Sequence, residues 1–291
     1  MNIDNLSVII ASNLINISKD WVKQINEYSK EGINVIISIP PNSILAEAYK
    51  IGFSENIKLF KSEKIGQVRQ RQFGYKFCDT EFIIQMDDDI QFDIDSIKLL
   101  LSNFERLPKK SCLAPFLKRK IKRNKNSNFL IKLKNILLYS EINPQEGKIA
   151  KSSFPISLNK FNNQLKMDFK EVDWLPGGIF IIRSEDLIKD DYFKFKGKAY
   201  CEDLIHSFLL KDKGLKLYLS SKLNFFTPEE SYRDLNINDF INFLFNDFII
   251  RNYYRKMINN KFIPLLFAYF YLLVSFIGSK LKKIFLYDEF H

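Results

Sequence analysis

Short apolar runs alternate with helical patterns along the first third of the chain, and this alternation constrains the fold more than any other feature. We expect buried strands, rich in Ile and Val, at Leu6–Ala11, Asn34–Ile39, Ile57–Phe60 and Phe82–Met86. We expect helices between them at Lys19–Lys30, Ser43–Gly52 and Gly66–Phe77. This order indicates βαβ units and a parallel sheet, hence an α/β protein. Ligands of such sheets bind outside the carboxyl ends of the strands, so the residues that follow these strands are the first candidates for a site.

The rest of the chain divides into a basic stretch, a return of strands and a helical tail. Eleven basic residues and no acidic residue occur between Arg106 and Lys134, which we interpret as a basic insert at residues 106–134. Strands are expected again at Val172–Trp174, Ile179–Ile182 and Leu215–Ser220. In the tail, apolar residues at spacings of three and four form a helical stripe of Ile237, Phe240, Ile241, Leu244, Phe245 and Phe248. We therefore predict an α/β domain over residues 1–230, with a boundary near Pro228, and a helical, aromatic-rich tail over residues 231–291.

Composition limits the classes of protein that need to be considered. Apolar residues make up 46% of the 291 residues, which excludes wholesale disorder. The three cysteines, Cys78, Cys112 and Cys201, lie far apart, so they predict neither a disulfide framework nor a zinc site, and they fit a reducing compartment. The N-terminal segment does not resemble a signal peptide, so we expect a cytosolic chain. The net charge of +10 indicates an anionic partner or a composition bias of the genome.

Three adjacent carboxylates, Asp87, Asp88 and Asp89, directly follow the strand Phe82–Met86. Their mutual repulsion is relieved by a hard divalent cation, because Mg²⁺ and Mn²⁺ prefer oxygen ligands. Alternation along a strand places Asp87 and Asp89 on the same side, with Asp88 facing away, so the outer two are candidate metal ligands. The alternative is a solvated acidic turn before a helix that begins near Asp93, and the local sequence is compatible with both.

Several motifs occur in a fixed order around this acidic triplet. They are Val8-Ile9-Ile10-Ala11-Ser12-Asn13, then Gly66, Arg71, Gln72 and Gly74, then Asp87-Asp88-Asp89, then Trp174-Leu175-Pro176-Gly177-Gly178, and finally Cys201-Glu202-Asp203-Leu204. In order and spacing, residues 6–230 resemble the inverting glycosyltransferases of family 2, which have the nucleotide-diphospho-sugar transferase (GT-A) fold. The resemblance therefore implies that fold, with a mostly parallel central sheet flanked by helices.

The resemblance also implies roles for individual residues. A nucleotide-sugar donor is expected at Ala11, Ser12, Gly66, Arg69, Arg71, Asp87 and Asp88, and a divalent metal, Mn²⁺ or Mg²⁺, at Asp87 and Asp89. An acceptor is expected at Trp174, Gly177 and Gly178. Asp203 is implied as the catalytic base, with Glu202 beside it as a second catalytic residue. Without the resemblance, Glu202 and Asp203 would be read as charges complementing a helix N-terminus, Trp174 as a core residue and the glycines as a tight turn.

Two departures from the family pattern bear on the substrates. Ser38-Ile39-Pro40-Pro41-Asn42-Ser43 replaces an Asp-bearing segment after the second strand, so the identity of the donor nucleotide stays open. The stretch 224–230 carries no histidine that could serve as a further ligand, and His206 is expected to be packed or exposed rather than a ligand. Metal binding would then depend on Asp87, Asp89 and the substrate.

Two further segments suggest a location at a membrane. The cationic stretch Lys118–Lys125 lacks interleaved aromatic residues, and no nucleic-acid-binding motif occurs, so we expect no nucleic-acid partner. Phe262–Ser279 is an uncharged run of 18 residues flanked by lysines, slightly shorter than the about 20 residues of a spanning helix. We therefore favour a helix that lies in the membrane interface or packs against a second copy in a homodimer, with Arg251, Arg255 and Lys256 attracting anionic lipids.

The hypothesis that follows is an inverting, metal-dependent glycosyltransferase that moves a sugar from a nucleotide-diphospho-sugar to a hydroxyl of a glycan or lipid-linked acceptor. We expect it in bacterial surface polysaccharide biosynthesis, cytoplasmic and peripheral at the inner face of the cytoplasmic membrane. One alternative is a sugar-nucleotidyltransferase, but the loop Ala11–Ser18 lacks the glycine-rich, basic sequence typical of that class. Another is a non-catalytic membrane- or nucleic-acid-binding protein, which the carboxylates at Asp87–Asp89 and Glu202–Asp203 disfavour.

Overall fold

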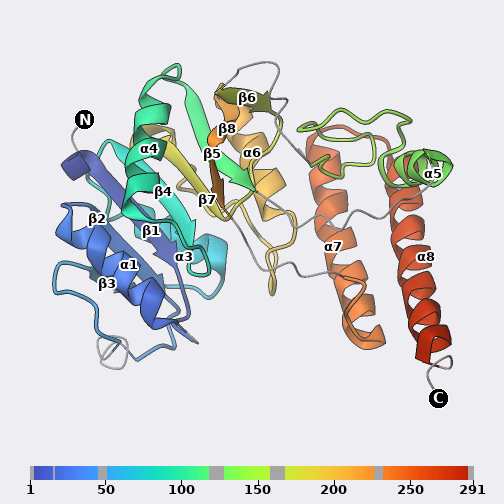
Figure 1. The fold of residues 1–291 in the computed structure, drawn as a ribbon, viewed down its shortest axis with the longest axis horizontal. Helices are drawn as coiled ribbons and strands as arrows, with labels where there is room; N and C mark the ends of the chain where they lie inside the picture. The colour runs from blue at the N-terminus through green and yellow to red at the C-terminus, as the bar shows by residue number, and fades with distance from the viewer. Residues whose placement is uncertain are drawn as a thin grey trace. The chain divides into compact units, whose positions relative to one another are not determined.

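The computed structural model describes residues 3–15, 17–44, 51–117, 128–157, 168–225 and 232–287. The chain divides into two compact units, and each is described by itself (Figure 1). The first, the α/β unit, comprises Met1–Lys118 and Phe161–Thr227. The second, the helical unit, comprises Arg119–Lys160 and Pro228–His291. The predicted basic insert is thus divided, because the helical unit contains its residues from Arg119 onward.

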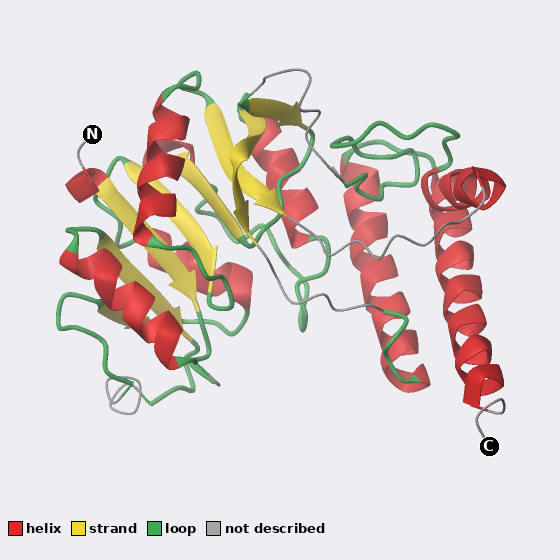
Figure 2. Ribbon diagram, viewed as in Figure 1, coloured by secondary structure: helices red, strands yellow, loops and turns green. Residues whose placement is uncertain are grey.

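A single sheet of eight strands forms the centre of the α/β unit (Figure 2). Its strands are β1 (Leu6–Ala11), β2 (Asn34–Ile39), β3 (Lys58–Lys61), β4 (Phe82–Asp87), β5 (Ser111–Leu117), β6 (Phe169–Val172), β7 (Ile179–Arg183) and β8 (Lys216–Phe225). They are arranged in the order β3-β2-β1-β4-β7-β5-β8-β6. The first four of this order are mutually parallel, as are β5 and β8, whereas β7 and β6 run antiparallel to their neighbours. The sheet is therefore mixed and mostly parallel, as expected for an α/β protein.

Helices cover both faces of this sheet. The helices α1 (Lys19–Lys30) and α4 (Ile94–Glu105) contact each other on one face, and α3 (Gln67–Tyr75) and α6 (Glu202–Asp212) lie on the other (Figure 1). A short 3₁₀ helix, Ile3–Asn5, precedes β1, and another, Ser184–Asp186, follows β7. Every residue of β1 is buried, which its apolar sequence makes possible because both faces of a parallel sheet are covered.

The register of three neighbouring strands brings their carboxyl ends into one row. Ala11, the last residue of β1, pairs with Ser38 of β2 on one side and with Asp87, the last residue of β4, on the other. The backbone N–H of Ser12 then donates to the Ser38 carbonyl at 3.1 Å. The segments expected to bind the donor therefore begin side by side at one edge of the sheet.

Most of the expected elements are confirmed, with small shifts at their ends. β1, β2 and α1 have the expected bounds, whereas the strand expected at Val172–Trp174 lies earlier, as β6. Ser111–Leu117, within the predicted basic insert, form β5 between β7 and β8, a strand that we did not expect. Lysines on both sides of a short apolar run concealed this strand in the sequence. Residues 45–50 of the helix expected at Ser43–Gly52, and the cationic stretch from residue 118, lie outside the described residues.

The described part of the helical unit consists of α5 (Asn128–Tyr139), α7 (Ile237–Met257), α8 (Phe262–Tyr287) and the loop of residues 140–157. α8 packs against α5 and α7 through one side, which buries Leu265, Ala268, Leu272 and Phe276. Of the stripe expected on α7, only Phe240 is fully buried. The other buried positions of α7 include a charged pair, Asp247 and Arg251, so its packed side is partly polar.

Candidate active site

Asp87 occupies the end of β4, where two side chains of α3 reach its carboxylate. The Oδ1 atom accepts a hydrogen bond from Gln67 Nε2 at 2.9 Å and another from the guanidinium of Arg71. Gln67 is the first residue of α3, and Gly66 before it has a φ of 125°, a conformation that favours glycine. The turn at Gly66 thus directs the start of α3 toward the acidic triplet.

Arg71 also contacts the start of α6. Its Nη1 atom donates to Glu202 Oε1 at 2.7 Å, so one guanidinium joins carboxylates from β4 and α6. The Arg71 side chain is only 3% exposed, and those of Asp87 and Glu202 are 21% and 11% exposed. Burial alone lowers the pKa of Arg71, but Asp87 and then Glu202 raise it above its usual range. The guanidinium therefore stays charged and neutralises part of this acidic cluster.

Gly177 and Gly178 lie between the two groups of carboxylates. A Cβ atom at Gly177 would lie 2.5 Å from Glu202 Oε1, and one at Gly178 would lie 3.2 Å from the ring of Phe225. The Gly178 carbonyl accepts the backbone N–H of Asp87 at 2.8 Å, and the Gly177 carbonyl accepts Gln85 Nε2 at 3.0 Å. A side chain at position 177 would therefore displace the Glu202 carboxylate, because the backbone there passes directly beside it.

The other two carboxylates of the triplet differ in their surroundings. Asp88 is half-buried and accepts a hydrogen bond from the hydroxyl of Ser12, which links the triplet to the loop after β1. Asp89 is exposed. Burial raises the pKa of Asp87 to about 6, although Arg71 opposes the rise. The Asp87 carboxylate is thus held by the buried Arg71 guanidinium.

A divalent metal fits the donor chemistry of Asp87 and Asp89 but needs additional ligands. The two residues offer carboxylate oxygens, and no described residue hydrogen-bonds Asp87 Oδ2. Within the described ranges, no group of three or more His, Cys, Asp or Glu side chains is arranged to hold a metal ion. One or two carboxylates completed by substrate phosphates and water is the arrangement typical of Mg²⁺.

The segment Cys201-Glu202-Asp203 forms the start of α6. Cys201 adopts a left-handed conformation with φ 54° and makes no side-chain cap to the helix. Asp203 is half-buried, and its Oδ1 atom accepts the backbone N–H of Leu204 at 2.9 Å. His206 is packed between the rings of Phe180 and Tyr192, and burial lowers its pKa to about 4. Of the two placements expected for His206, packed or exposed, the structure shows the packed one.

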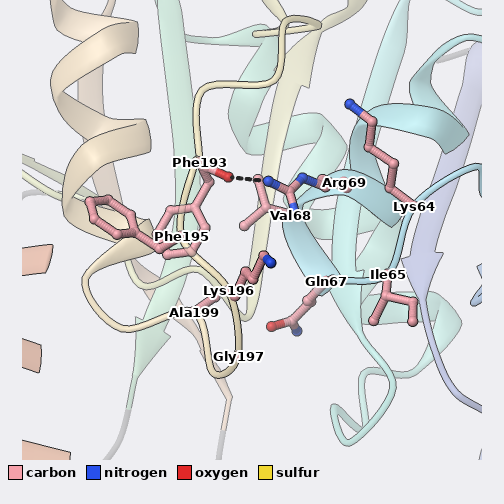
Figure 3. A pocket seen from close by; sticks show the side chains of 11 residues that line it. Lys64, Ile65, Gln67, Val68, Arg69, Phe193, Phe195, Lys196, Gly197 and Ala199 are labelled. Atoms are coloured by element: carbon pink, nitrogen blue, oxygen red, sulfur yellow. Dashed lines mark hydrogen bonds between the residues drawn. The ribbon is translucent and has the colours of Figure 1, made fainter. Parts of the chain in front are cut away.

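A cavity of about 490 Å³ lies beside the start of α3 (Figure 3). Gln67 and Arg69 contribute to one wall, and Phe193 and Phe195 contribute to the opposite wall; Gly66 also lines the cavity. Arg69 donates to the Phe193 carbonyl at 3.2 Å and forms an ion pair with Asp191 at 3.1 Å. Because Gln67 also binds Asp87, the cavity adjoins the acidic triplet. The predicted donor residues of this region thus fall into two groups. Gly66 and Arg69 line the cavity, whereas Arg71 is buried against the carboxylates of Asp87 and Glu202.

Trp174 lies in the interior, 8% exposed, and its indole Nε1 atom has no hydrogen-bond partner among the described residues. The aromatic rings that face a cavity are instead Phe193 and Phe195, which the sequence reasoning missed. The available signal was their position shortly before Glu202-Asp203. Gln67 was also missed, although it lies between Gly66 and Arg69 in the sequence.

Comparisons with known proteins concern the family and the fold. Residues 42–162, less than half of the chain, match the family described as Glycosyl transferase family 2. The fold is similar to the crystal structure of GalNAc-T7 with UDP, GalNAc and Mn²⁺, with a TM-score of 0.53 and 16% identity, over 78% of this chain and 43% of that chain. Residues 1–349 of S. aureus TarS match with a TM-score of 0.42 and 14% identity, over 76% of this chain and 60% of that chain. No protein with a curated description matches the sequence.

Residues 42–162 thus match glycosyl transferase family 2, and the fold of the chain is similar to that of GT-A glycosyltransferases. The predicted resemblance to glycosyl transferase family 2 is thereby confirmed. The chain spans less than two thirds of the length of either similar structure.

Proposed function

We propose that the chain is an inverting glycosyltransferase that moves a sugar from a nucleotide-diphospho-sugar to a hydroxyl group of a glycan or lipid-linked acceptor. The observation that carries this proposal is the placement of Asp87, Glu202 and Asp203 around the Gly177–Gly178 backbone. Segments far apart in the chain thus bring carboxylates to a single site at the edge of the sheet. The donor side is formed by the ends of β1, β2 and β4, and the acceptor side by the start of α6.

The reaction is a displacement at the anomeric carbon of the donor sugar. The acceptor oxygen forms a bond to this carbon as the bond to the diphosphate oxygen breaks, and the diphosphate leaves with the bonding electrons. Asp203 accepts the hydroxyl proton of the acceptor, a role that requires a carboxylate within hydrogen-bond reach. Asp87 and Asp89 would hold Mn²⁺ or Mg²⁺, which when bound neutralises charge on the diphosphate.

The positions of the remaining residues support a division of tasks. Ala11 and Ser12 lie at the end of β1, where the donor nucleotide would contact the backbone, and Ser12 positions Asp88. The acceptor is proposed to lie beside Gly177 and Gly178, where the absence of side chains lets Glu202 and Phe225 pack directly against the backbone. Phe193 and Phe195 offer apolar faces against which a sugar ring or an acceptor chain can pack.

The proposed function is tested by screening UDP-, GDP- and dTDP-sugars for thermal stabilisation and hydrolysis with Mn²⁺ and with a chelator. We expect one nucleotide class to stabilise the protein and to be hydrolysed slowly, in both cases only with metal. If none of these donors binds with metal present, the proposed function is wrong. If a donor is hydrolysed equally well with a chelator present, the protein is still a glycosyltransferase, but the proposed metal dependence is wrong.

We propose in addition that the helical unit binds the cytoplasmic face of the membrane, as suits a lipid-linked acceptor of surface polysaccharide synthesis. Phe262–Lys282 is the one helical segment of the described chain long and apolar enough to cross a membrane, with a mean hydropathy of 2.0. Most of its large apolar side chains are exposed, namely Phe262, Ile263, Leu266, Phe267, Phe270, Leu273, Val274, Ile277 and Leu281. Monomeric soluble proteins rarely expose an apolar surface of this extent.

Two neighbouring features support a lipid surface as the occupant. α7 exposes a second apolar stripe, formed by Ile237, Ile241, Phe245, Ile249 and Tyr253. Lysines flank the apolar part of α8 at Lys261, Lys280 and Lys282, as expected for contact with anionic head groups.

Flotation with vesicles of equimolar phosphatidylglycerol and phosphatidylcholine tests the proposal. We expect the protein to float with the vesicles. A stable dimer that does not bind vesicles would show that a second copy of the chain covers this surface instead.

A further inference from the structure

The most heavily buried charged group of the site is the guanidinium of Arg71. It lies on α3 and binds Asp87, sixteen positions along the chain, and Glu202, 131 positions along the chain. A planar guanidinium can bind two carboxylates at once through separate N–H groups, whereas an ammonium group lacks this fixed fork. Arg71 is therefore the physical link between the end of β4, on the donor side, and the start of α6, on the acceptor side.

The start of α6 depends on this link more than most helix starts would. Its N-cap residue, Cys201, has a left-handed conformation and makes no side-chain cap hydrogen bond, and within the first turn Asp203 Oδ1 accepts the Leu204 N–H at 2.9 Å. Serine, threonine, aspartate and asparagine normally supply this cap, with a contribution of about 1 kcal/mol. At α6 the ion pair between Arg71 and Glu202 satisfies no backbone N–H group, but it fixes the first residue of the helix to α3.

The position of Asp203 follows from that of Glu202. The Asp203 Cβ atom would lie 3.5 Å from a Cβ at Gly177, and Glu202 Oε1 would lie 2.5 Å from the same point. Both residues are thus packed against one glycine, and Arg71 binds the Glu202 oxygen that lies nearest to this glycine. A displacement of Glu202 would rotate the first turn of α6 and carry Asp203 with it.

We propose that Arg71 is a positioning residue that holds the start of α6, and through it Asp203, in register with Asp87. This role differs from contact with the donor diphosphate, because the guanidinium is buried against carboxylates. The effect of Arg71 on catalysis rests on the proposed function, whereas its effect on the position of the start of α6 does not. Displacement of a reacting group by about 1 Å can reduce a rate by about 10²-fold.

The test compares Arg71→Lys with Arg251→Lys. Arg251 is a matched control, because it is also buried in an ion pair, with Asp247 of the helical unit, and its side chain is 9% exposed. The first measurement is hydrogen exchange of the backbone amides of residues 202–206. Arg71→Lys is expected to accelerate their exchange at least tenfold and Arg251→Lys to leave it unchanged. Unchanged exchange in Arg71→Lys would overturn the proposal, whether or not a substrate is known.

The second measurement is transfer kinetics, with the folded fraction of each variant determined by thermal unfolding. Arg71→Lys is expected to lower kcat about 10²-fold and to change KM for donor and acceptor less than threefold, since lysine keeps the charge but not the geometry. A kcat within threefold of the parent would overturn the proposal. A parent protein that transfers no sugar would refute the proposed function instead, and the exchange measurement would still decide the role of Arg71.

Discussion

The two units of the chain distribute charged and apolar side chains in opposite ways. The α/β unit buries apolar strands on both faces and gathers carboxylates at the strand ends, where Asp87 and Glu202 share Arg71. The helical unit buries the ion pair of Asp247 and Arg251 and leaves most large side chains of α8 exposed. The first pattern is typical of a catalytic site in water, and the second of a surface that contacts an apolar medium.

The buried charges of the two units also differ in what they can do. In the α/β unit, the Arg71 cluster adjoins an exposed carboxylate, Asp89, and a cavity, so substrates can reach it. In the helical unit, Asp247 accepts from the Tyr269 hydroxyl, and Arg251 donates to the Ser153 carbonyl at 3.3 Å, so the pair is surrounded by its own chain. We infer that the first cluster serves chemistry and the second holds helices together.

The largest expected effect is that of Asp89→Ala on donor binding and turnover in the α/β unit. Asp89→Ala is expected to abolish metal-dependent donor binding and to lower turnover by more than 10³-fold, because charge stabilisation at a leaving group is among the largest catalytic contributions. Isothermal calorimetry with Mn²⁺ and the donor measures the binding. Asp95→Ala, another exposed carboxylate nearby, is the control and should bind as the parent does. A donor affinity of Asp89→Ala equal to that of the parent would show that Asp89 is not a metal ligand.

The corresponding change in the helical unit is expected to affect stability rather than chemistry. Asp247→Ala leaves the Arg251 guanidinium buried without its partner carboxylate, and breaking a buried pair in this way costs about 3–5 kcal/mol. Chemical unfolding followed by circular dichroism measures the loss. Asn246→Ala, at the exposed neighbouring position, should cost less than 1 kcal/mol. Equal stability of the two variants would contradict a structural role for this pair.

A smaller effect is expected on membrane binding. The double variant Phe267→Ser/Phe270→Ser removes two rings that are 51% and 57% exposed on α8, and vesicle affinity should fall at least tenfold. Sedimentation with phosphatidylglycerol-containing vesicles measures it. Leu99→Ser, 39% exposed on α4 of the α/β unit, is the control and should bind vesicles as the parent does. Loss of binding in both variants would show that the contact is not specific to the helical unit.

The smallest effect concerns pH and the buried face of α6. The pKa of His206 is lowered to about 4 by burial, whereas an unfolded histidine titrates near 6.5, so the unfolded state binds more protons between these values. The free energy of unfolding should therefore decrease as the pH falls, by about 2 kcal/mol between pH 7 and pH 5 from this residue. His206→Phe should lack this part of the pH dependence. Urea unfolding of the parent and of His206→Phe at pH 7 and pH 5 measures this difference. If both proteins lose the same free energy of unfolding between the two pH values, the assignment to His206 is wrong.

The strands of the donor side could be predicted because their information is local. Leu6–Ala11 and Phe82–Met86 are continuous apolar runs, and the residues that follow a parallel strand lie at the ligand-binding edge wherever the helices pack. Asp87 and Ser12 were identified for this reason. The strand β5 was not predicted, because the apolar run of Ser111–Leu117 is bounded by basic residues and was included in the predicted basic insert.

The link formed by Arg71 could not be predicted from the sequence. It depends on the distance between two side chains, those of Arg71 and Glu202, that are 131 positions apart, and no local pattern encodes it. The same holds for the wall of Phe193 and Phe195, which faces α3 only after folding. The helical pattern of α7 was readable, but the medium that its apolar stripe contacts was not, because a core and a membrane select the same side chains.

The most direct test of the proposed site is the transfer rate of Asp203→Asn, measured together with its donor affinity. Asparagine keeps the size of the side chain but cannot accept the acceptor's proton, so transfer should fall by about 10²–10⁴-fold. Donor and metal affinity should stay within about twofold, because Asp203 faces the acceptor hydroxyl in this account. Asp212→Asn, at the far end of the same helix, controls for the loss of a negative charge from α6. Transfer by Asp203→Asn at the parent rate would show that this carboxylate only complements the start of α6, and that the catalytic base lies elsewhere.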